Sequence, residues 1–517
     1  MPEKTDVLVI GSGASGCITA LMAGDNGADV ILITRAEDLK DSNTSMAQGG
    51  IIYKGIKDSP ELLIKDIETA GAGKCYHKAV KFLSEEGPKC VKEILIDKLK
   101  VHFDKDKKGN LDLTDEAAHS IPRIAHYEDL TGKAIENTLS AAIISHPRIK
   151  VFRSATAVDL LTLSHHSKNP TDIYEPLTCV GAYVLFQDKD RVEPIFAKET
   201  VLATGGLGQL YLHTTNPIGA RGDGIALAYR SGARLINLEY IQFHPTALYH
   251  SEAERFLISE SVRGEGGILI RKNGEDFMKK FHPLGSLAPR DVVARAIHQV
   301  LLEFNEPCVY LDITHKKSSW IKGRFPNIYA RCLDYDIDIT KHPIPVVPAA
   351  HYSCGGVWVD LEGRSTIYRL RAVGEVSCTG VHGANRLAST SLLEAVLWGY
   401  STGISIAKEI KTKKYGFPSI PDWKNEEEIV DPALILQDWM TIKYSMWNYV
   451  GLMRTTRRMN RAKHILRELQ LEIESFYRRG KLTDELIGLR NGVQTALAVL
   501  FACMENHESR GCHYRLD

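Results

Sequence analysis

Residues 6–36 read DVLVIGSGASGCITALMAGDNGADVILITRA, and this stretch decides the fold of the first part of the chain. It has the pattern of a buried strand, a glycine-rich turn, a helix and a second buried strand. Both strands are continuous runs of valine, isoleucine and leucine, as in a parallel sheet that is covered on both faces. The sequence therefore predicts an α/β fold that begins with a Rossmann-like domain.

Three glycines in the turn, Gly11, Gly13 and Gly16, follow the pattern G-x-G-x-x-G. The first allows a tight turn, the second lets a pyrophosphate approach the backbone, and the third lets the helix pack closely on the strand. The N-terminus of the helix would stabilise the pyrophosphate charge. The motif predicts dinucleotide binding by Gly11, Ser12, Gly13, Ala14, Ser15 and Gly16.

The choice between NAD and FAD depends on other segments. At the end of the second strand, where an acidic residue commonly binds ribose, the chain has Thr34 and Arg35. Three further glycine features lie far apart, namely SMAQGG (45–50), ATGG (203–206) and GDG (222–224). A cofactor contacted by such separated segments is long. This favours FAD, and Arg35 could face its phosphate or its ribose.

Composition limits the class of protein. The 517 residues predict about three domains. The formal net charge is zero, which gives no argument for nucleic acid or membrane binding. The ten cysteines form no C-x-x-C pair, so we expect no metal site and reduced thiols. We expect a soluble cytoplasmic protein, because there is no signal peptide and the most apolar window, near residue 500, is about half the length that spans a bilayer.

The amino-acid composition and the pattern of apolar residues change twice along the chain. A segment rich in prolines and histidines separates the pieces of the nucleotide domain, and helical patterns follow a polar linker near the C-terminus. We predict a discontinuous FAD-binding domain (1–235 and 352–411), an inserted α+β capping domain that binds substrate (236–351) and a C-terminal helical bundle (418–517).

A family resemblance is carried by long motifs in order along the chain: SNTSMAQGG, RGDGIALAYRSGA, QFHPTAL, SVRGEGG, APRDVVARAI, PAAHYSCGG, GEVSCTGVHGANRLASTSLLEA and ESRGCHYRLD. Through them the chain resembles the succinate dehydrogenase/fumarate reductase flavoprotein family from end to end. Within that family it is most similar to the members that oxidise L-aspartate in the first step of bacterial de novo NAD synthesis.

The resemblance implies FAD contacts beyond the glycine turn. Glu375 follows a predicted strand and can accept from ribose hydroxyls. Ser391 and Leu392 begin a helix whose N-terminus would stabilise charge on the reduced flavin, although Ser391 could instead be a plain N-cap. Relatives in membrane complexes attach FAD covalently through a histidine where this chain has Asn43, so noncovalent FAD is expected. The implied contacts are Arg35, Asn43, Thr44, Ser45, Met46, Ala47, Gln48, Gly49, Gly50, Thr204, Gly205, Asp223, Glu375, Ser391 and Leu392.

A four-carbon dicarboxylate needs cationic groups at both ends, and arginine presents a planar fork that matches a carboxylate. The candidates are His244, Arg290, His351 and Arg386, which lie in glycine- or proline-flanked segments and match the family's pattern. Each one alone has a structural explanation, since single histidines are commonly structural and helix-end arginines are commonly solvated. Together they predict a substrate site.

Arg290 begins a predicted helix opened by Pro289, where the helix dipole disfavours a positive charge. The resemblance implies that Arg290 is the family's proton donor and acceptor, and the dipole would ease proton release. Because the pKa of arginine lies above about 12, the alternative is that Arg290 holds a substrate carboxylate while the amine loses its proton elsewhere.

The α-ammonium separates aspartate from succinate and requires a carboxylate partner. Glu116 matches the glutamate that orients aspartate in this branch of the family. Its alternative reading is an ordinary helix-start charge beside Thr114. Ser259 and Glu260 are further candidates for substrate contact.

The resemblance implies oxidation of L-aspartate to iminoaspartate, with dioxygen or fumarate as electron acceptor, under a capping domain that closes to exclude water. The unstable product suggests transfer to quinolinate synthase. A soluble fumarate reductase is the alternative enzyme, and Glu116 argues against it. A flavin-bearing RNA-binding protein would use the basic helix at 454–469, but Glu468, Glu472 and Glu474 favour a solvated bundle face.

Overall fold

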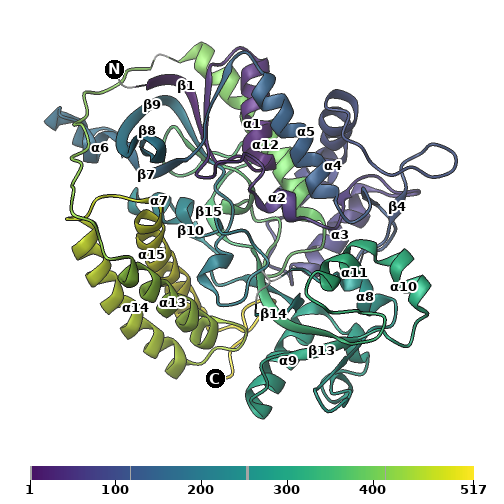
Figure 1. Ribbon diagram of the computed structural model, residues 1–517. Helices are drawn as coiled ribbons and strands as arrows, with labels where there is room; N and C mark the ends of the chain where they lie inside the picture. Colours follow the sequence, from purple (N-terminus) through teal and green to yellow (C-terminus); the bar gives the residue numbers. More distant parts are fainter. Residues whose placement is uncertain (1–2, 117, 252–255, 414) are drawn as a thin grey trace.

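The structure is a computed structural model that describes residues 3–116, 118–251, 256–413 and 415–517 (Figure 1). Its largest sheet has seven strands. Six lie in the order β6 (Ile149–Phe152), β2 (Val30–Ile33), β1 (Glu3–Ile10), β9 (Arg191–Leu202), β8 (Cys179–Phe186) and β7 (Ala155–Thr162), and β16 (Leu370–Ala372) also pairs with β9.

The sheet is mixed rather than purely parallel. β1 runs parallel to β2 and β9, with Val7 opposite Val30 and Glu199, and β6 and β16 extend the parallel part. β7, β8 and β9 form an antiparallel meander. The predicted α/β fold with a Rossmann-like half is confirmed, but the sequence motifs did not reveal the meander.

The helix that follows the glycine turn covers one face of this sheet and packs against a helix far away in sequence. α1 (Ala14–Asp25) packs on α12 (Thr390–Thr412), and Figure 1 shows them side by side. Glycines permit the close approach, because an added Cβ at Gly399 would lie 2.9 Å from Ser15 O and one at Gly403 would lie 2.6 Å from Met22 Cβ. This contact brings the start of α12 next to the glycine turn, so segments far apart in the sequence meet beside the large sheet.

The other elements of the FAD-binding part surround the sheet. They are α2 (Asn43–Met46), β3 (Ile51–Ile52), α3 (Pro60–Ala70), α4 (His77–Cys90), a π-helical segment (Val91–Lys98), β4 (Leu113–Thr114), β5 (Ile124–Ala125), α5 (Thr131–Ser145), α6 (Leu163–His166), α7 (Asp223–Arg230), β10 (Leu235–Ile236), β15 (Gly356–Trp358) and β17 (Ser377–Cys378).

The middle segment has its own sheet and its own hydrophobic cluster, which includes Val293, Ile297 and Leu311. The strands are antiparallel in the order β11 (Ile241–Leu248), β14 (Ile344–Ser353), β13 (Val309–Asp312) and β12 (Ile268–Ile270), and the helices are α8 (Glu260–Gly264), α9 (Arg290–Phe304), α10 (Ser318–Arg324) and α11 (Pro326–Leu333). The expected helix is α9, with Pro289 as its N-cap and Arg290 as its first residue. The domain boundaries themselves remain predictions.

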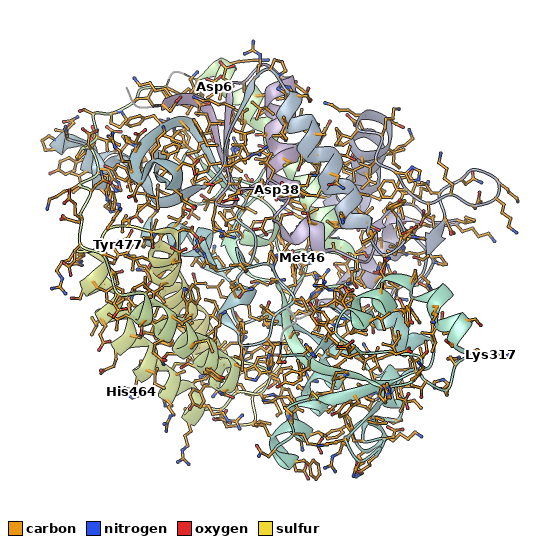
Figure 2. All side chains as sticks on the ribbon, viewed as in Figure 1. Asp6, Asp38, Met46, Lys317, His464 and Tyr477 are labelled. Atoms are coloured by element: carbon orange, nitrogen blue, oxygen red, sulfur yellow. The ribbon has the colours of Figure 1, made fainter. Side chains whose placement is uncertain are left out.

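The chain ends in a bundle of α13 (Pro432–Val450), α14 (Thr456–Tyr477) and α15 (Asp484–Glu505). Within the described ranges, α15 alone is long and apolar enough to cross a membrane, and 78% of its apolar window is buried, as in the core helix of a globular protein. The apolar stretch of α15 is therefore longer than the window near residue 500 that the sequence analysis identified. Figure 2 shows His464 and Lys317 on outer edges and Met46 near the centre of the view.

Candidate functional site

A cavity of about 830 Å³ extends from the glycine turn to the middle segment. Its wall contains almost every residue selected from the sequence: Gly11, Ser12, Gly13, Ala14, Ser15, Arg35, Asn43 to Gly50, Thr204, Gly205, Asp223, Glu375, Ser391, Leu392, Glu116, His244, Ser259, Glu260, Arg290, His351 and Arg386. Gly16 is the exception, because it packs α1 on β1. An added Cβ at Gly16 would lie 2.2 Å from Gly11 O.

The glycine turn leaves the N-terminus of α1 open toward the cavity. Gly11 has a φ of 116°, and an added Cβ would lie 2.2 Å from Ala203 O. Gly13 is the N-cap of α1 and makes no side-chain capping bond. An added Cβ there would meet only Thr44 Oγ1 at 3.5 Å and Ser42 Cβ at 3.8 Å. Ala14 N donates to Thr44 Oγ1 at 3.0 Å, and the next N–H groups of this helix end can bind an anion.

The segment from Asn43 to Gly50 forms the next part of the wall. Asn43 Nδ2 donates to Glu375 Oε2 at 2.8 Å, and Ser353 N donates to Glu375 Oε1 at 3.0 Å. Burial raises the pKa of Glu375 to about 7. An added Cβ at Gly50 would lie 2.3 Å from Ala125 O, so this segment lies flat on β5. Asn43 thus ties the segment to the turn after β16.

Charged groups gather at the end of the cavity that faces the helical bundle. Arg35 pairs with Asp41 at 3.4 Å and with Asp484 at 3.5 Å. Asp223 accepts from the guanidinium of Arg221 and from Asn491 Nδ2. This end therefore holds two of the three charged residues that were assigned to the cofactor, Arg35 and Asp223, and α15 contributes to it.

Arg386 lies in the loop just before α12. Its Nη1 donates to Ser391 Oγ at 3.0 Å, and its guanidinium carbon lies 4.6 Å from the centroid of the Tyr352 ring. The N-cap of α12 is Ser389, so the alternative of Ser391 as a plain N-cap is wrong. Arg386 Nε has no hydrogen-bond partner among the described residues. The guanidinium is thus fixed in place but left open for a carboxylate.

A buried polar network lies behind Arg386. Tyr352 OH donates to Glu394 Oε2 at 3.1 Å, and His382 Nε2 lies 2.9 Å from the same oxygen. Burial alone would raise the pKa of Glu394, but the neighbouring His382 outweighs it and the pKa falls below its ordinary value. The network therefore holds Tyr352, whose ring lies against Arg386, without occupying the guanidinium.

His244 and His351 face each other with ring centroids 5.5 Å apart. Burial, followed by the positive charge of nearby arginines, holds the pKa of both imidazoles well below its ordinary value. Both rings are therefore neutral. Thr246 N donates to His244 Nδ1 at 3.2 Å, so the proton of His244 lies on Nε2, where it can be donated to a ligand.

Arg290 is held by Glu260, which also pairs with Arg263 at 3.1 Å. Burial alone would lower the pKa of Arg290, but Glu260 and Glu116 outweigh it and raise the pKa above its ordinary value. The expectation that Arg290 releases its proton easily is therefore wrong in sign, because the two carboxylates raise its pKa. Ser259 caps α8 by accepting from Ser261 N at 3.3 Å.

Glu116 lies in the loop between β4 and β5, so the alternative of a helix-start charge is wrong. Ser389 Oγ donates to Glu116 Oε2 at 2.7 Å. Glu116 Oε1 lies over Gly49, where an added Cβ would come within 2.8 Å of it. This carboxylate therefore stands at the junction between the proposed flavin segment and the start of α12.

Sequence reasoning missed several residues of the wall. Arg263, Tyr352 and Ser389 each stand inside a motif that was quoted for its neighbours. Asp129 and Asn327 lie outside all of the motifs that were identified in the sequence. Asn327 Nδ2 donates to Asp129 Oδ1, a contact that joins α11 of the middle segment to the loop before α5. Only the folded chain shows this link.

The residues present fit FAD. The cavity is long, an open helix N-terminus faces it, and its wall contains glycines where the backbone can approach a ligand. Thr204 Oγ1 and Gln48 Oε1 are buried without hydrogen-bond partners in the part of the chain that the structure describes. Unpartnered buried polar atoms in a cavity wall are typical of a site completed by its ligand.

Comparisons with known proteins support this cofactor. The family described as FAD binding domain matches residues 6–392, and the family described as fumarate reductase flavoprotein C-term matches residues 440–517. The "L-aspartate oxidase" of Yersinia pestis is 43% identical over 520 residues, which cover 99% of this chain and 96% of the relative. The "L-aspartate oxidase, chloroplastic" of Arabidopsis thaliana is 39% identical over 540 residues, with 99% and 81% coverage.

Solved structures agree with the sequence relatives. A variant of E. coli quinol fumarate reductase FrdA superimposes with a TM-score of 0.87 at 27% identity, over 100% of this chain and 92% of that one. From its motifs, its fold and these full-length matches, the chain belongs to the L-aspartate oxidase family of the succinate dehydrogenase/fumarate reductase flavoproteins.

Proposed function

We propose that the protein oxidises L-aspartate to iminoaspartate on noncovalently bound FAD, as the first step of de novo NAD biosynthesis. The full-length L-aspartate oxidase relatives support the activity. The observation in the structure that carries the choice of substrate is the position of Glu116. Its carboxylate stands on the cavity wall at the end that also holds Arg290, Arg386 and two neutral histidines. The carboxylate of Glu260 at the same end is already engaged by Arg290 and Arg263.

The residues of this end suit the two carboxylates and the ammonium of aspartate. Arg386 holds one carboxylate with its open guanidinium, and Nε2 of the neutral His244 donates a hydrogen bond to it. Arg290 stays charged because of its raised pKa and holds the other carboxylate. Glu116 accepts from the α-ammonium and is the base that we propose for the proton that the nitrogen must lose as the hydride leaves Cα and the C=N bond forms. When bound, FAD supplies the acceptor for the hydride from the substrate Cα.

Fumarate reduction by the same site needs a proton at carbon. Arg290 is the donor that we propose for this direction, and Glu260 and Arg263 behind it form the chain of contacts through which its proton is restored. In aspartate oxidation the same arginine acts by holding charge. The asparagine at position 43, whose amide is engaged by Glu375, supports the proposal of noncovalent FAD.

Denaturation tests the mode of attachment. Acid or heat should release yellow FAD into the supernatant of the precipitated protein, because Asn43 has no nucleophilic nitrogen. Flavin that remains in the washed precipitate would contradict noncovalent binding.

The acceptors, the partner and the location follow as further parts of the proposal. Dioxygen or fumarate reoxidises the flavin, the unstable product passes to quinolinate synthase, and the enzyme works in the cytoplasm. The RNA-binding alternative loses support, because Arg454 at the start of its basic stretch is fully buried and donates to Glu239 O at 2.8 Å. It is therefore unavailable to a nucleic acid.

Product analysis tests the activity. Purified protein reconstituted with FAD should convert L-aspartate, with dioxygen or fumarate, to iminoaspartate, which hydrolyses to oxaloacetate and ammonia in equal amounts. D-aspartate and succinate should give much lower rates. Equal rates with succinate and L-aspartate would favour the fumarate reductase alternative.

A further inference from the structure

One face of α15 contacts the segment that carries Asp223. Asn491 Nδ2 donates to Asp223 Oδ1 at 2.9 Å. One turn further along, Thr495 Oγ1 donates to Gly222 O at 3.0 Å. An added Cβ at Gly222 would lie 2.6 Å from Thr495 Cγ2, so the two segments are in close contact. α7 and α15 lie side by side in Figure 1.

The same face continues toward the N-terminus of α15. Asp484 pairs with Arg221 at 2.8 Å, and Arg221 in turn pairs with Asp223 at 2.9 Å. Gly488 makes room for this arginine, because an added Cβ would lie 2.5 Å from its guanidinium carbon. Asp484 also faces Arg35. The spacing of 484, 488, 491 and 495 places these four residues on one side of the helix.

We propose that this face of α15, defined by Asp484, Gly488, Asn491 and Thr495, is part of the FAD site because it positions Asp223. The proposal rests on FAD as the cofactor. The matched FAD-binding family ends at residue 392, so α15 lies outside it. Asp223 is the first residue of α7, its side chain is 14% exposed, and it lies in the cavity wall. A carboxylate whose orientation is fixed in advance binds a ligand hydroxyl at a lower entropic cost.

A pair of isosteric substitutions on α15 isolates this role. Asn491 and Gln494 are both buried, both accept from Arg230 Nη1, and each donates to one carboxylate: Asn491 to Asp223 and Gln494 to Glu474. Asn491→Asp replaces the donor that faces Asp223 with a negative charge. Gln494→Glu does the same to Glu474, away from the cavity wall.

We would measure the binding of FAD to each apoprotein through the quenching of flavin fluorescence. We expect the dissociation constant for FAD to rise about tenfold or more in Asn491→Asp, through loss of a charge-assisted hydrogen bond, and to change less than about twofold in Gln494→Glu. A general loosening of the bundle would affect both variants equally, whereas direct repulsion of anionic FAD by the added charge would persist after Asp223 is replaced. Equal effects, or none, would overturn the proposal.

A double variant tests whether the effect passes through Asp223. Asp223→Asn should itself weaken FAD binding, and adding Asn491→Asp to it should change the dissociation constant by less than about twofold, because coupled residues are not additive. The same factor in both backgrounds would overturn the positioning role.

If Asn491→Asp fails to fold, Thr495→Val serves in its place. It removes only the hydroxyl that donates to Gly222 O and should weaken FAD binding about threefold. Unchanged binding in this variant would then count against the proposal. Wild-type protein that binds no FAD would instead refute the proposed function, so the two failures are distinguishable.

Discussion

The two ends of the cavity are built differently. The cofactor end consists mainly of short contiguous motifs, and Gly11, Gly13 and the segment 43–50 line the cavity there. The substrate end consists of charged and polar side chains that arrive from separate elements, including Glu116 and Arg290. From this difference we expect the cofactor end to determine whether FAD is bound. We expect the substrate end to determine which molecule the bound FAD reacts with. Substitutions should therefore separate flavin content from turnover.

Arg290→Leu should produce the largest effect. The variant should keep the flavin spectrum but lose aspartate oxidation and fumarate reduction by about four orders of magnitude, which corresponds to roughly 5.5 kcal/mol of transition-state stabilisation. Its charge is held in the cavity by Glu260, and leucine leaves the substrate carboxylate without its cation while Glu260 keeps only Arg263 as a partner. Steady-state kinetics of flavin-saturated protein measure the loss.

Arg295→Leu on the same helix is the control. Arg295 pairs with Asp291 at 2.8 Å and is not part of the cavity wall. Its removal should leave kcat within about twofold, as is usual for a partly exposed ion pair. Near-normal turnover in Arg290→Leu would show that Arg290 is only a helix-end charge.

Glu116→Gln should separate the two substrates. The amide is nearly isosteric but loses a charge-assisted hydrogen bond to the α-ammonium worth about 1.5–3 kcal/mol, so kcat/KM for L-aspartate should fall roughly ten- to a hundredfold. Fumarate has no ammonium, and its reduction should fall much less. Asp112→Asn, which changes an exposed aspartate in the same region, is the control and should leave both activities unchanged. An equal loss of both activities would make Glu116 a structural residue.

Gly13→Ala should weaken the cofactor end without unfolding it. The φ of Gly13 is −66°, which alanine adopts readily, and the added methyl group meets only two atoms of the protein at ordinary distances. The methyl group instead occupies the approach of the pyrophosphate, so the FAD dissociation constant should rise about tenfold or more. Turnover per bound flavin should stay close to that of the wild type.

Gly323→Ala in α10 is the matched control, because an added Cβ there has nothing within 4 Å. Its flavin affinity should not change. A Gly13→Ala protein that binds FAD normally but turns over slowly would break the distinction between the two ends.

Tyr352→Phe should have the smallest effect. The ring under Arg386 remains, but the hydroxyl that donates to Glu394 is lost, so Arg386 is less firmly placed. KM for L-aspartate should rise roughly two- to tenfold, as expected for one hydrogen bond, with kcat little changed. Tyr240→Phe, which removes a hydroxyl from the same hydrophobic cluster outside the cavity wall, is the control. A fall in kcat alone would contradict a positioning role for Tyr352.

The sequence predicted the cofactor end well and the substrate end in part, for a physical reason. Backbone contacts depend on local glycine patterns, and these are visible in short motifs such as residues 11–16. The pairing of Glu116 with Ser389 joins residues far apart in the chain and depends on how α12 packs on α1. The sign of the pKa shift of Arg290 likewise depends on neighbours that no local pattern contains.

The contact of α15 with Asp223 could not be predicted from the sequence for the same reason. Asn491 lies in a helix that reads as ordinary bundle core, and only the packing of α15 on α7 brings it to Asp223. The antiparallel meander of the main sheet also escaped prediction, because β7 and β8 are buried strands with apolar runs like those of the parallel part.

Anaerobic mixing of the FAD-loaded protein with substrate tests the central claim most directly. Bleaching of the oxidised flavin absorbance reports hydride transfer without any electron acceptor, so it depends only on the cavity and its ligand. Full bleaching by L-aspartate with little or none by succinate at the same concentration is the predicted result. Bleaching by succinate that is as fast and as complete as that by L-aspartate would contradict the account.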